Sequence, residues 1–417
     1  MMGKVYVIGA GLAGLSAATW LAARGQAVAV IEGAGQAGGR CRSYFDPAMD
    51  AVIDNGNHLV LSGNRAVHDY LARIGAADGL VGPAHAEFPF VDLRDGARWT
   101  LRPNEGPLPW WMASDSRRVP GTRLGDYLRY LPLLWAGKEA RIDRFVPPRG
   151  MLWDRLMKPF FVAALNTAPE ESSAALAGAV LRETLAKGGR HYRPRIAHPT
   201  LAAAFVDPAL KYIAAHGGTV RLGTRLRALT REGCAVTALD VADGAIPLTR
   251  KDAVVLAVPP WGAADLVPGL TVPDRFHAIV NAHYKLPRPP GAPAILGVVG
   301  GTAEWIFTFD DRVSVTCSFA DAIVDLDREE LAARIWADVS RALNIAAPMP
   351  AWQIVKEKRA TFSATPQQDA RRPAANSGLR NLFLAGDWTR TGLPATIEGA
   401  LRSGETAAAL ALRHLSV

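Results

Sequence analysis

A run of glycines and one acidic residue near the start of the chain have the spacing of a site for nucleotide phosphates. Residues 9–14 read Gly-Ala-Gly-Leu-Ala-Gly after an apolar segment at 4–8, and a glutamate ends a second apolar segment at 28–31. In such a unit the glycines allow a tight turn, close approach to a pyrophosphate and packing of helix on strand. The helix N-terminus faces the phosphates, and the carboxylate binds ribose hydroxyls. The residues predicted to bind a dinucleotide here are Gly9, Gly11, Leu12, Ala13, Gly14 and Glu32.

A glycine pair and an arginine follow the acidic residue. Gly38 and Gly39 would keep the chain close to the ligand, and Arg40 offers a fork of N–H donors to its pyrophosphate. The spacing Glu-x5-Gly-Gly-Arg resembles that of the glutathione-reductase-type FAD proteins, in the branch that holds amine oxidases and carotenoid desaturases. This resemblance implies FAD as the cofactor. A surface loop with a solvated arginine is the alternative.

The segment 54–58 reads Asp-Asn-Gly-Asn-His. In the same branch of FAD proteins, Asp-x-Gly resembles the stretch that passes beside the isoalloxazine ring. Gly56 would allow close approach of the backbone, and Asn57 and His58 would point toward flavin or substrate. A buried, hydrogen-bonded structural histidine is the alternative for His58.

The C-terminal segment carries a second motif of this kind. An apolar strand is expected at 381–385, followed by Gly386 and Asp387 and then by a helix that ends near Leu415. The pattern resembles the second FAD fingerprint of the branch, in which the aspartate accepts a ribityl hydroxyl or orders water at the pyrophosphate. The positive end of the helix would face the flavin edge that becomes negative on reduction. The flavin contacts implied here are Gly386, Asp387, Thr396, Ile397 and Ala400.

The middle of the chain completes the predicted architecture. Within residues 219–258, apolar and polar residues alternate at first, and the segment ends in an apolar strand. In the resembling FAD proteins one apolar residue of this region packs against adenine, and Leu226 matches that position best. No second glycine fingerprint precedes a helix, so the electron donor for the flavin should be a diffusible partner. The expected fold is α/β, with a discontinuous Rossmann-like FAD domain of the glutathione-reductase type (1–60, 219–260 and 353–417). An α+β substrate domain (61–218 and 261–352) interleaves with it.

Composition narrows the classes of protein. The 417 residues are 49% hydrophobic and 21% charged with a net charge of +8, which excludes disorder. The three cysteines lie far apart in the sequence, which suits a reducing compartment, and no metal site is expected. No apolar stretch is long enough to predict a helix that spans a membrane. Residues 117–158 hold ten basic and four acidic residues among Trp, Tyr and Leu, which favours an interfacial membrane patch over nucleic acid. A solvated face over core aromatics is the alternative.

Several longer stretches resemble one family, the bacterial squalene-associated FAD-dependent desaturases, which are the hydroxysqualene dehydroxylases of hopanoid biosynthesis. The similarity runs nearly end to end. Its most specific stretches are Ile-Asp-Asn-Gly-Asn-His-Leu-Val-Leu-Ser-Gly-Asn at 53–64, Arg-Trp-Thr-Leu-Arg-Pro-Asn at 98–104, Leu-Pro-Trp-Trp at 108–111, Ala-Leu-Asn-Thr at 164–167 and Leu-Arg-Glu-Thr-Leu at 181–185. The resemblance implies reduction of the allylic C30 alcohol hydroxysqualene to squalene, by an enzyme in the cytoplasm at the surface of the inner membrane.

This reaction needs a proton donor for the departing hydroxyl and a dry, apolar cavity. His58 is the first candidate acid and His283 the second, while Asn57, Asn281 and Asn166 are candidates for orienting the hydroxyl or a water. Three other functions stay open. A carotenoid or phytoene desaturase would oxidise its polyene precursor, and an amine oxidase would usually carry a lysine where the strand beside the flavin here offers Asn281. A non-catalytic prenyl-lipid carrier on the same fold is the third.

Overall fold

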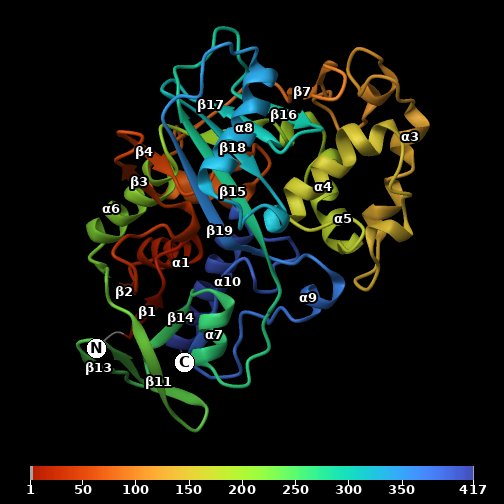
Figure 1. The fold of residues 1–417 in the computed structure, drawn as a ribbon. Helices are drawn as coiled ribbons and strands as arrows, with labels where there is room; N and C mark the ends of the chain where they lie inside the picture. Colours follow the sequence, from red (N-terminus) through yellow and green to blue (C-terminus); the bar gives the residue numbers. More distant parts are fainter. Residues whose placement is uncertain (1–2, 417) are drawn as a thin grey trace.

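The computed structural model describes residues 3–416. Its nucleotide-binding unit is a five-stranded parallel sheet in the order β10-β2-β1-β14-β20, with all neighbours parallel (Figure 1). The strands are β1 (Lys4–Ile8), β2 (Ala27–Ile31), β10 (Thr219–Arg221), β14 (Ala253–Leu256) and β20 (Leu382–Leu384). All four residues of β14 are buried, as expected for a parallel strand covered on both faces. Segments from both ends and the middle of the chain therefore build one sheet, which confirms the predicted α/β class.

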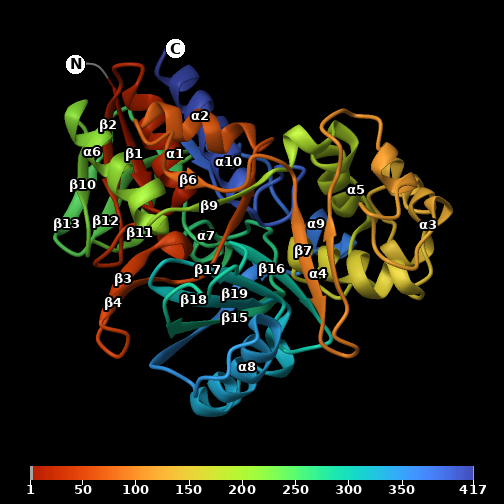
Figure 2. The same cartoon turned by 90° about the horizontal axis from the view of Figure 1, so that it is seen from above.

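Helices cover this sheet. α1 (Leu12–Ala22) and α10 (Ile397–Leu415) pack side by side in one apolar cluster with α2 (Arg65–Arg73) and α6 (Asp207–Ala215). The Ser16 hydroxyl donates to the Leu401 carbonyl at 2.9 Å, which fastens α1 to α10. The two described ends of the chain lie on the same side of the sheet (Figures 1 and 2).

A seven-stranded mixed sheet forms the second unit, in the order β19-β15-β18-β17-β16-β7-β8. Side chains alternate along a strand, so Ala278, Val280 and Ala282 of β15 pack against α8 (Arg328–Leu343) on one face. Asn281 and His283 lie on the opposite face. The strands are β7 (Phe88–Asp92), β8 (Arg98–Leu101), β15 (Phe276–Lys285), β16 (Ile295–Val299), β17 (Trp305–Thr308), β18 (Arg312–Cys317) and β19 (Trp352–Phe362).

Two segments near the expected domain boundaries pair or pack with elements that the sequence places in the other domain. β19 was assigned to the FAD domain from 353 on, yet it pairs with β15 along most of its length, so it belongs to the large sheet. α6 was assigned to the substrate domain, yet it packs in the same cluster as α1. For both β19 and α6, the elements that they pair or pack with come from distant parts of the chain. We propose FAD-domain segments that begin just before α6 and just after Phe362.

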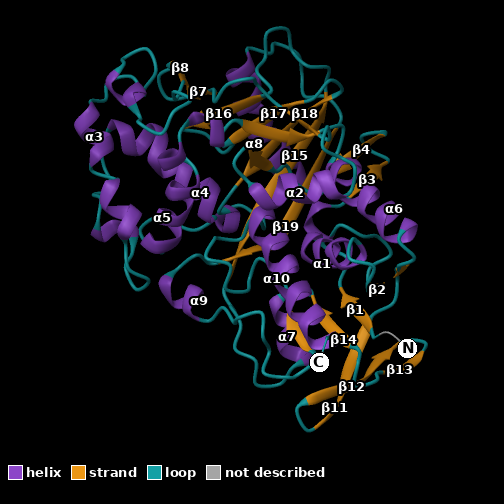
Figure 3. Ribbon diagram, turned by 180° about the vertical axis from the view of Figure 1, so that it is seen from behind, coloured by secondary structure: helices purple, strands orange, loops and turns teal. Residues whose placement is uncertain are grey.

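The helical part of the molecule lies beside the large sheet (Figure 3). There α4 (Lys158–Leu165) and α5 (Ala174–Glu183) pack together, and the short α3 (Leu124–Leu128) lies at the outer edge. No helix within residues 3–416 has the length and apolar character needed to cross a bilayer. The other elements are β3 (Ser43–Asp46), β4 (Ala51–Asp54), β5 (Leu59–Leu61), β6 (Leu80–Val81), β9 (Pro194–Ala197), β11 (Leu226–Glu232), β12 (Ala235–Val241), β13 (Gly244–Pro247), α7 (Pro260–Leu266) and α9 (Pro366–Ala370).

Candidate active site

The glycine loop between β1 and α1 has the geometry of a phosphate cradle. Gly9 has a φ of 104°, and a Cβ at Gly14 would lie 1.9 Å from the Gly9 carbonyl oxygen, so no larger residue fits at either position. At Gly11, by contrast, no atom lies within 4 Å of an added Cβ. α1 begins at Leu12, and the first N–H groups of a helix lack intrahelical partners. The loop therefore offers both space and donors to a pyrophosphate.

Glu32 holds the loops on the other side of this cradle. Its carboxylate accepts the N–H groups of Ala10 at 2.7 Å and Ala34 at 2.8 Å. Its carbonyl accepts the Thr224 N–H at 2.8 Å, which brings the start of β11 and the buried Leu226 next to this end of the site. The contact of Leu226 with adenine stays a prediction.

Arg40 joins the N-terminal and C-terminal motifs. Its Nη2 lies 2.7 Å from Oδ2 of Asp387, and its Nη1 donates to the Ala360 carbonyl at 2.5 Å. Just before it, the Gly38 N–H donates to the Ala10 carbonyl at 2.8 Å, so the second glycine pair lies against the first loop. Asp387 is almost fully buried, whereas 43% of the Arg40 side chain is exposed. The guanidinium can therefore bind a phosphate while the aspartate holds it in place.

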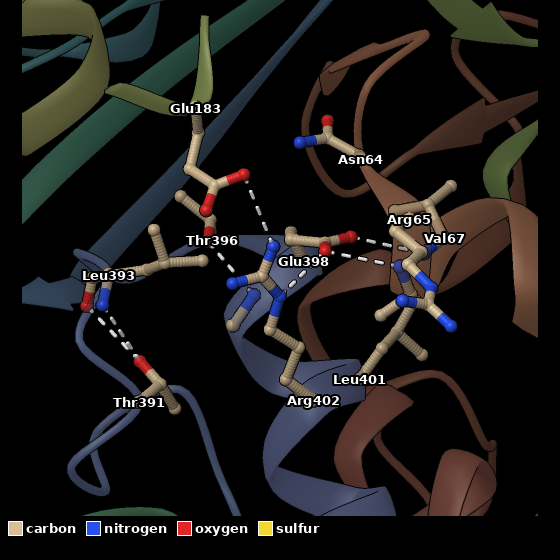
Figure 4. Close-up of polar contacts among 12 residues, drawn as sticks. Asn64, Arg65, Val67, Glu183, Thr391, Leu393, Thr396, Glu398, Leu401 and Arg402 are labelled. Carbon is tan, nitrogen blue, oxygen red and sulfur yellow. Dashed lines mark hydrogen bonds and ion pairs between the residues drawn. The ribbon is translucent and has the colours of Figure 1, made fainter. Parts of the chain in front are cut away.

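α10 begins at Ile397, a short loop after Asp387, and the first N–H groups of a helix lack intrahelical partners. Thr396 caps the helix, accepting the Gly399 N–H at 3.0 Å. Glu398 sits in the first turn but faces away, because its carboxylate accepts the N–H groups of Ala66 and Val67 at the start of α2 (Figure 4). Arg402 then bridges Glu398, at 2.7 Å, and Glu183 of α5, at 3.5 Å. The positive helix end thus stays free for an anionic ligand edge.

The segment 54–58 lies against the polar face of β15. A Cβ on Gly56 would come within 2.9 Å of Nδ2 of Asn281, so a larger residue here would have to displace the Asn281 amide. Asn281 Oδ1 accepts the Thr316 hydroxyl at 2.8 Å and the Asn57 N–H at 3.3 Å. Asn57 also donates to Thr316 at 3.3 Å, and its Oδ1 is buried without a protein partner. The structure therefore brings Asn57 and Asn281 together, as two of the candidates for orienting a hydroxyl.

Burial lowers the pKa of both candidate histidines. Burial, with a smaller contribution from Arg40, lowers the pKa of His58 to about 4. Burial, with a smaller contribution from Arg312, lowers the pKa of His283 to about 3. His283 is fully buried, and its Nδ1 lies 2.8 Å from the Ser314 hydroxyl. A lowered pKa favours the neutral imidazole at both positions near pH 7, and the acid role of either histidine stays a prediction.

Asn166 lies apart from the other candidates. It ends α4 with a φ of 47° and fastens that helix to the large sheet. Its Nδ2 donates to the Thr361 hydroxyl at 2.9 Å and to the His277 carbonyl at 3.4 Å, and its Oδ1 accepts the Phe319 N–H at 2.5 Å. No hydrogen bond joins it to Asn57 or Asn281 among the described residues. Its catalytic role stays a prediction.

Sequence reasoning missed two polar residues at this wall, Thr316 and Glu357. Thr316 bonds both Asn57 and Asn281, and Oε2 of Glu357 lies 3.5 Å from Nδ2 of Asn55. Both lie on strands of ordinary alternating pattern, so only a correct strand register could have indicated them.

The residues fit FAD. The open space at Gly11, the paired but exposed Arg40 and the free N-terminus of α10 suit a pyrophosphate and a flavin edge. Asn55 and Asn57 each bury an Oδ1 without a protein partner beside the close approach at Gly56. Among residues 3–416, no group of three His, Cys, Asp or Glu side chains could hold a metal ion.

Known proteins resemble this chain over nearly its full length. Residues 12–412 match the flavin containing amine oxidoreductase family. Hydroxysqualene dehydroxylase of Sinorhizobium fredii is 52% identical over 409 residues (98% of both chains), and that of Rhodopseudomonas palustris is 53% identical over 413 residues (99% of both). Among solved structures, cyclohexylamine oxidase from Brevibacterium oxydans superposes with a TM-score of 0.74 at 15% identity over 100% of both chains, which shows the shared fold. The chain therefore belongs to the hydroxysqualene dehydroxylase family of FAD-dependent oxidoreductases.

Proposed function

We propose that this chain catalyses the FAD-dependent reductive dehydroxylation of hydroxysqualene to squalene. The observation that carries the proposal is its identity of about one half, over almost the full length, to enzymes named for this reaction. The cradle described above would hold the cofactor. Bound FAD, once reduced by a diffusible donor, would supply a hydride to the carbon that loses its hydroxyl group.

The chain's own residues would bind, orient and protect the substrate. Asn57 and Asn281 form one hydrogen-bonded unit with Thr316, which could fix the direction of the substrate hydroxyl. The neutral form of His58, which its lowered pKa favours, could donate one hydrogen bond and accept another. Exclusion of water matters because an allylic cation that met water would return to the alcohol.

The decisive experiment compares substrates under reducing and oxidising conditions. Anaerobic protein with reduced flavin should convert hydroxysqualene to squalene, detected by gas chromatography. Oxidised protein should leave phytoene unchanged and release no hydrogen peroxide with amines. Phytoene oxidation without squalene formation would identify a desaturase instead, and a colourless protein that binds the lipid without turnover would identify a carrier.

An apolar and basic surface supports contact with a membrane. Five large apolar side chains between 117 and 158 are exposed, namely Leu124, Leu128, Leu131, Trp135 and Met151, and Leu108 and Trp110 lie just before them. Trp135 is 79% exposed, and the Arg117 guanidinium lies 4.6 Å from the centre of the Trp110 ring. Exposed Arg123 and Arg129 flank α3. Large apolar side chains interspersed with arginines suit the surface of an anionic bilayer, where a C30 lipid dissolves.

The proposed location is the cytoplasmic face of the inner membrane. Cys41, Cys234 and Cys317 carry free thiols, which suits a reducing compartment.

A further inference from the structure

We propose that Arg372 is a positioning residue for FAD, which holds the C-terminal cofactor loop (386–393) in the conformation that binds the cofactor. Arg372 lies between α9 and β20 in the chain, and its side chain is fully buried. Arginines are rarely buried completely, because each N–H donor of the guanidinium then needs a partner within the protein. Most of these partners lie in the cofactor loop. The role needs only FAD as the cofactor and does not depend on the substrate.

The guanidinium of Arg372 holds this loop mainly by its backbone. Nε donates to the Thr389 carbonyl at 2.9 Å, and Nη2 donates to the Asp387 carbonyl at 3.1 Å. Nη2 also donates to the Thr391 hydroxyl at 2.7 Å. A planar guanidinium reaches several acceptors in a fixed geometry, which a lysine cannot do. One side chain therefore fixes alternate residues of a loop that contains no helix or strand.

Asp387 is held at both ends by arginines with different surroundings. Its carboxylate pairs with Arg40 at 2.7 Å, and its carbonyl accepts the N–H of Arg372. The side chain of Arg40 is 43% exposed, whereas that of Arg372 is 0% exposed. Arg40 can therefore bind a phosphate, while Arg372 can act on the cofactor only through the loop that it holds.

The same loop extends the effect of Arg372 to the start of α10. The Thr391 hydroxyl, which accepts the N–H of Arg372, also accepts the Leu393 N–H at 3.2 Å (Figure 4). Leu393 lies shortly before Thr396, the cap of α10. The loop thus connects two of the implied flavin contacts, Asp387 at one end and the N-terminus of α10 at the other. Arg372 contacts the stretch between them.

An acidic and an aromatic side chain hold the guanidinium itself. Nη1 of Arg372 donates to Oδ1 of Asp369 at 2.8 Å, and Cζ lies 4.8 Å from the centre of the Phe362 ring. Burial lowers the pKa of Arg372 and Asp369 opposes this effect, so the buried charge is paired. The backbone adds a further contact, because the Arg390 N–H donates to the Pro373 carbonyl at 2.8 Å. Protein contacts alone therefore clamp the loop.

A clamped loop should bind FAD more tightly than a loose one. A loop that must first be ordered loses conformational entropy on binding, which lowers the apparent affinity. Asp387 and Thr389 are buried, so loss of the guanidinium would deprive buried carbonyl groups of a donor and favour other loop conformations. The surroundings of the bound flavin should change as a result.

The test titrates apoprotein with FAD and compares Arg372→Lys with Arg371→Lys. Arg371 is a matched control, because this neighbouring side chain contacts Asp274 at 2.7 Å and the Val272 carbonyl at 2.9 Å instead of the loop. Arg372→Lys keeps the charge but loses the planar fork, so the Kd for FAD should rise about 10- to 100-fold. The visible circular dichroism of the bound flavin should change as well. Arg371→Lys should alter neither quantity.

A milder variant covers the case in which Arg372→Lys does not fold. Thr391→Val has a similar shape, keeps Arg372 and removes one of its acceptors, so the Kd for FAD should rise about 3- to 10-fold. Urea unfolding of each apoprotein measures stability separately from FAD affinity.

The proposal is wrong if Arg372→Lys is less stable in urea yet binds FAD with unaltered affinity and an unaltered flavin spectrum, because Arg372 would then support only the fold. An equal loss of affinity in Arg371→Lys would also overturn it. So would normal FAD binding by Thr391→Val where Arg372→Lys does not fold. These measurements use FAD alone, so a chain that binds FAD as expected but leaves hydroxysqualene unchanged would refute the proposed reaction and not the role of Arg372.

Discussion

Arg40 and Asp387, which lie 347 residues apart, form an ion pair with Nη2 and Oδ2 separated by 2.7 Å. The pair joins the first and last cofactor motifs of the chain, so the cradle exists only when both ends of the chain have folded. Asp387 is almost fully buried, whereas Arg40 keeps a face open to the ligand. We therefore expect the aspartate to act on bound FAD both directly and through the arginine that it holds.

Asp387→Asn should weaken FAD binding by about 10- to 100-fold, because a charge-assisted hydrogen bond is worth roughly 1.5–3 kcal/mol. Titration of apoprotein with FAD, followed by flavin fluorescence, measures the change. Asp69→Asn removes the acidic partner of the exposed Arg65–Asp69 pair and should leave FAD affinity unaltered. Equal affinities in all three proteins would contradict a role for the pair.

Gly56→Ala should lose about 1–3 kcal/mol of unfolding free energy and alter the flavin absorption spectrum, because its Cβ would lie 2.9 Å from Asn281 Nδ2. Asn281→Ala removes the clashing amide, so the double variant should recover part of the loss in urea unfolding. Gly262→Ala, where the nearest atom is 3.7 Å away, is the control. Strict additivity of the two single changes would count against the contact.

His283 should make the protein less stable as the pH falls from about 6.5 to 4. Its folded pKa, about 3, lies below the ordinary value of 6.5, so the unfolded chain binds a proton that the folded chain refuses. The free energy of unfolding should drop by up to about 1.4 kcal/mol per pH unit across this window from His283. His283→Gln should flatten the pH dependence in urea unfolding, and a slope as steep as before would contradict the prediction.

Leu128→Ser combined with Trp135→Ser should lower binding to anionic vesicles by at least about tenfold, since each change removes an exposed apolar side chain that could insert. Sedimentation with phosphatidylglycerol vesicles gives the partition coefficient, and added salt should weaken binding through the arginines. Trp261→Ser, at another exposed tryptophan on α7, should bind like the unaltered protein. Equal loss in this control would indicate nonspecific adsorption.

Glu398→Gln should destabilise the fold by about 1–3 kcal/mol, because the buried carboxylate accepts two N–H groups at the start of α2 and pairs with Arg402 (Figure 4). Thermal unfolding of apoprotein measures this loss without interference from FAD. Glu405→Gln, on the same helix, removes a more exposed carboxylate, which pairs with Arg73, and should cost less. A reversed order of the two losses would show that α2 is fastened elsewhere.

The sequence by itself determined the motifs that bind the cofactor. Local geometry sets the spacing of the motif residues, because a tight turn, a close approach of the backbone to a ligand and the start of a helix constrain only neighbouring residues. These residues are Gly9, Gly11, Gly14, Glu32 and Arg40. The same holds for the motif at Gly386 and Asp387. Apolar runs with both faces buried likewise indicated a parallel sheet. Similarity to the hydroxysqualene dehydroxylases could be inferred from longer sequence stretches, such as residues 53–64.

Only the tertiary structure decided which distant residues meet. The pairing of β19 with β15 places β19 in the large sheet and Oε2 of Glu357 within 3.5 Å of Nδ2 of Asn55, and nothing in the alternating sequence of β19 indicates that partner. Burial lowered the pKa of His58 and His283, and packing around Asn166 tied it to the sheet. Strand register, desolvation and charge all depend on neighbours far away in the chain, so short-range patterns cannot specify them.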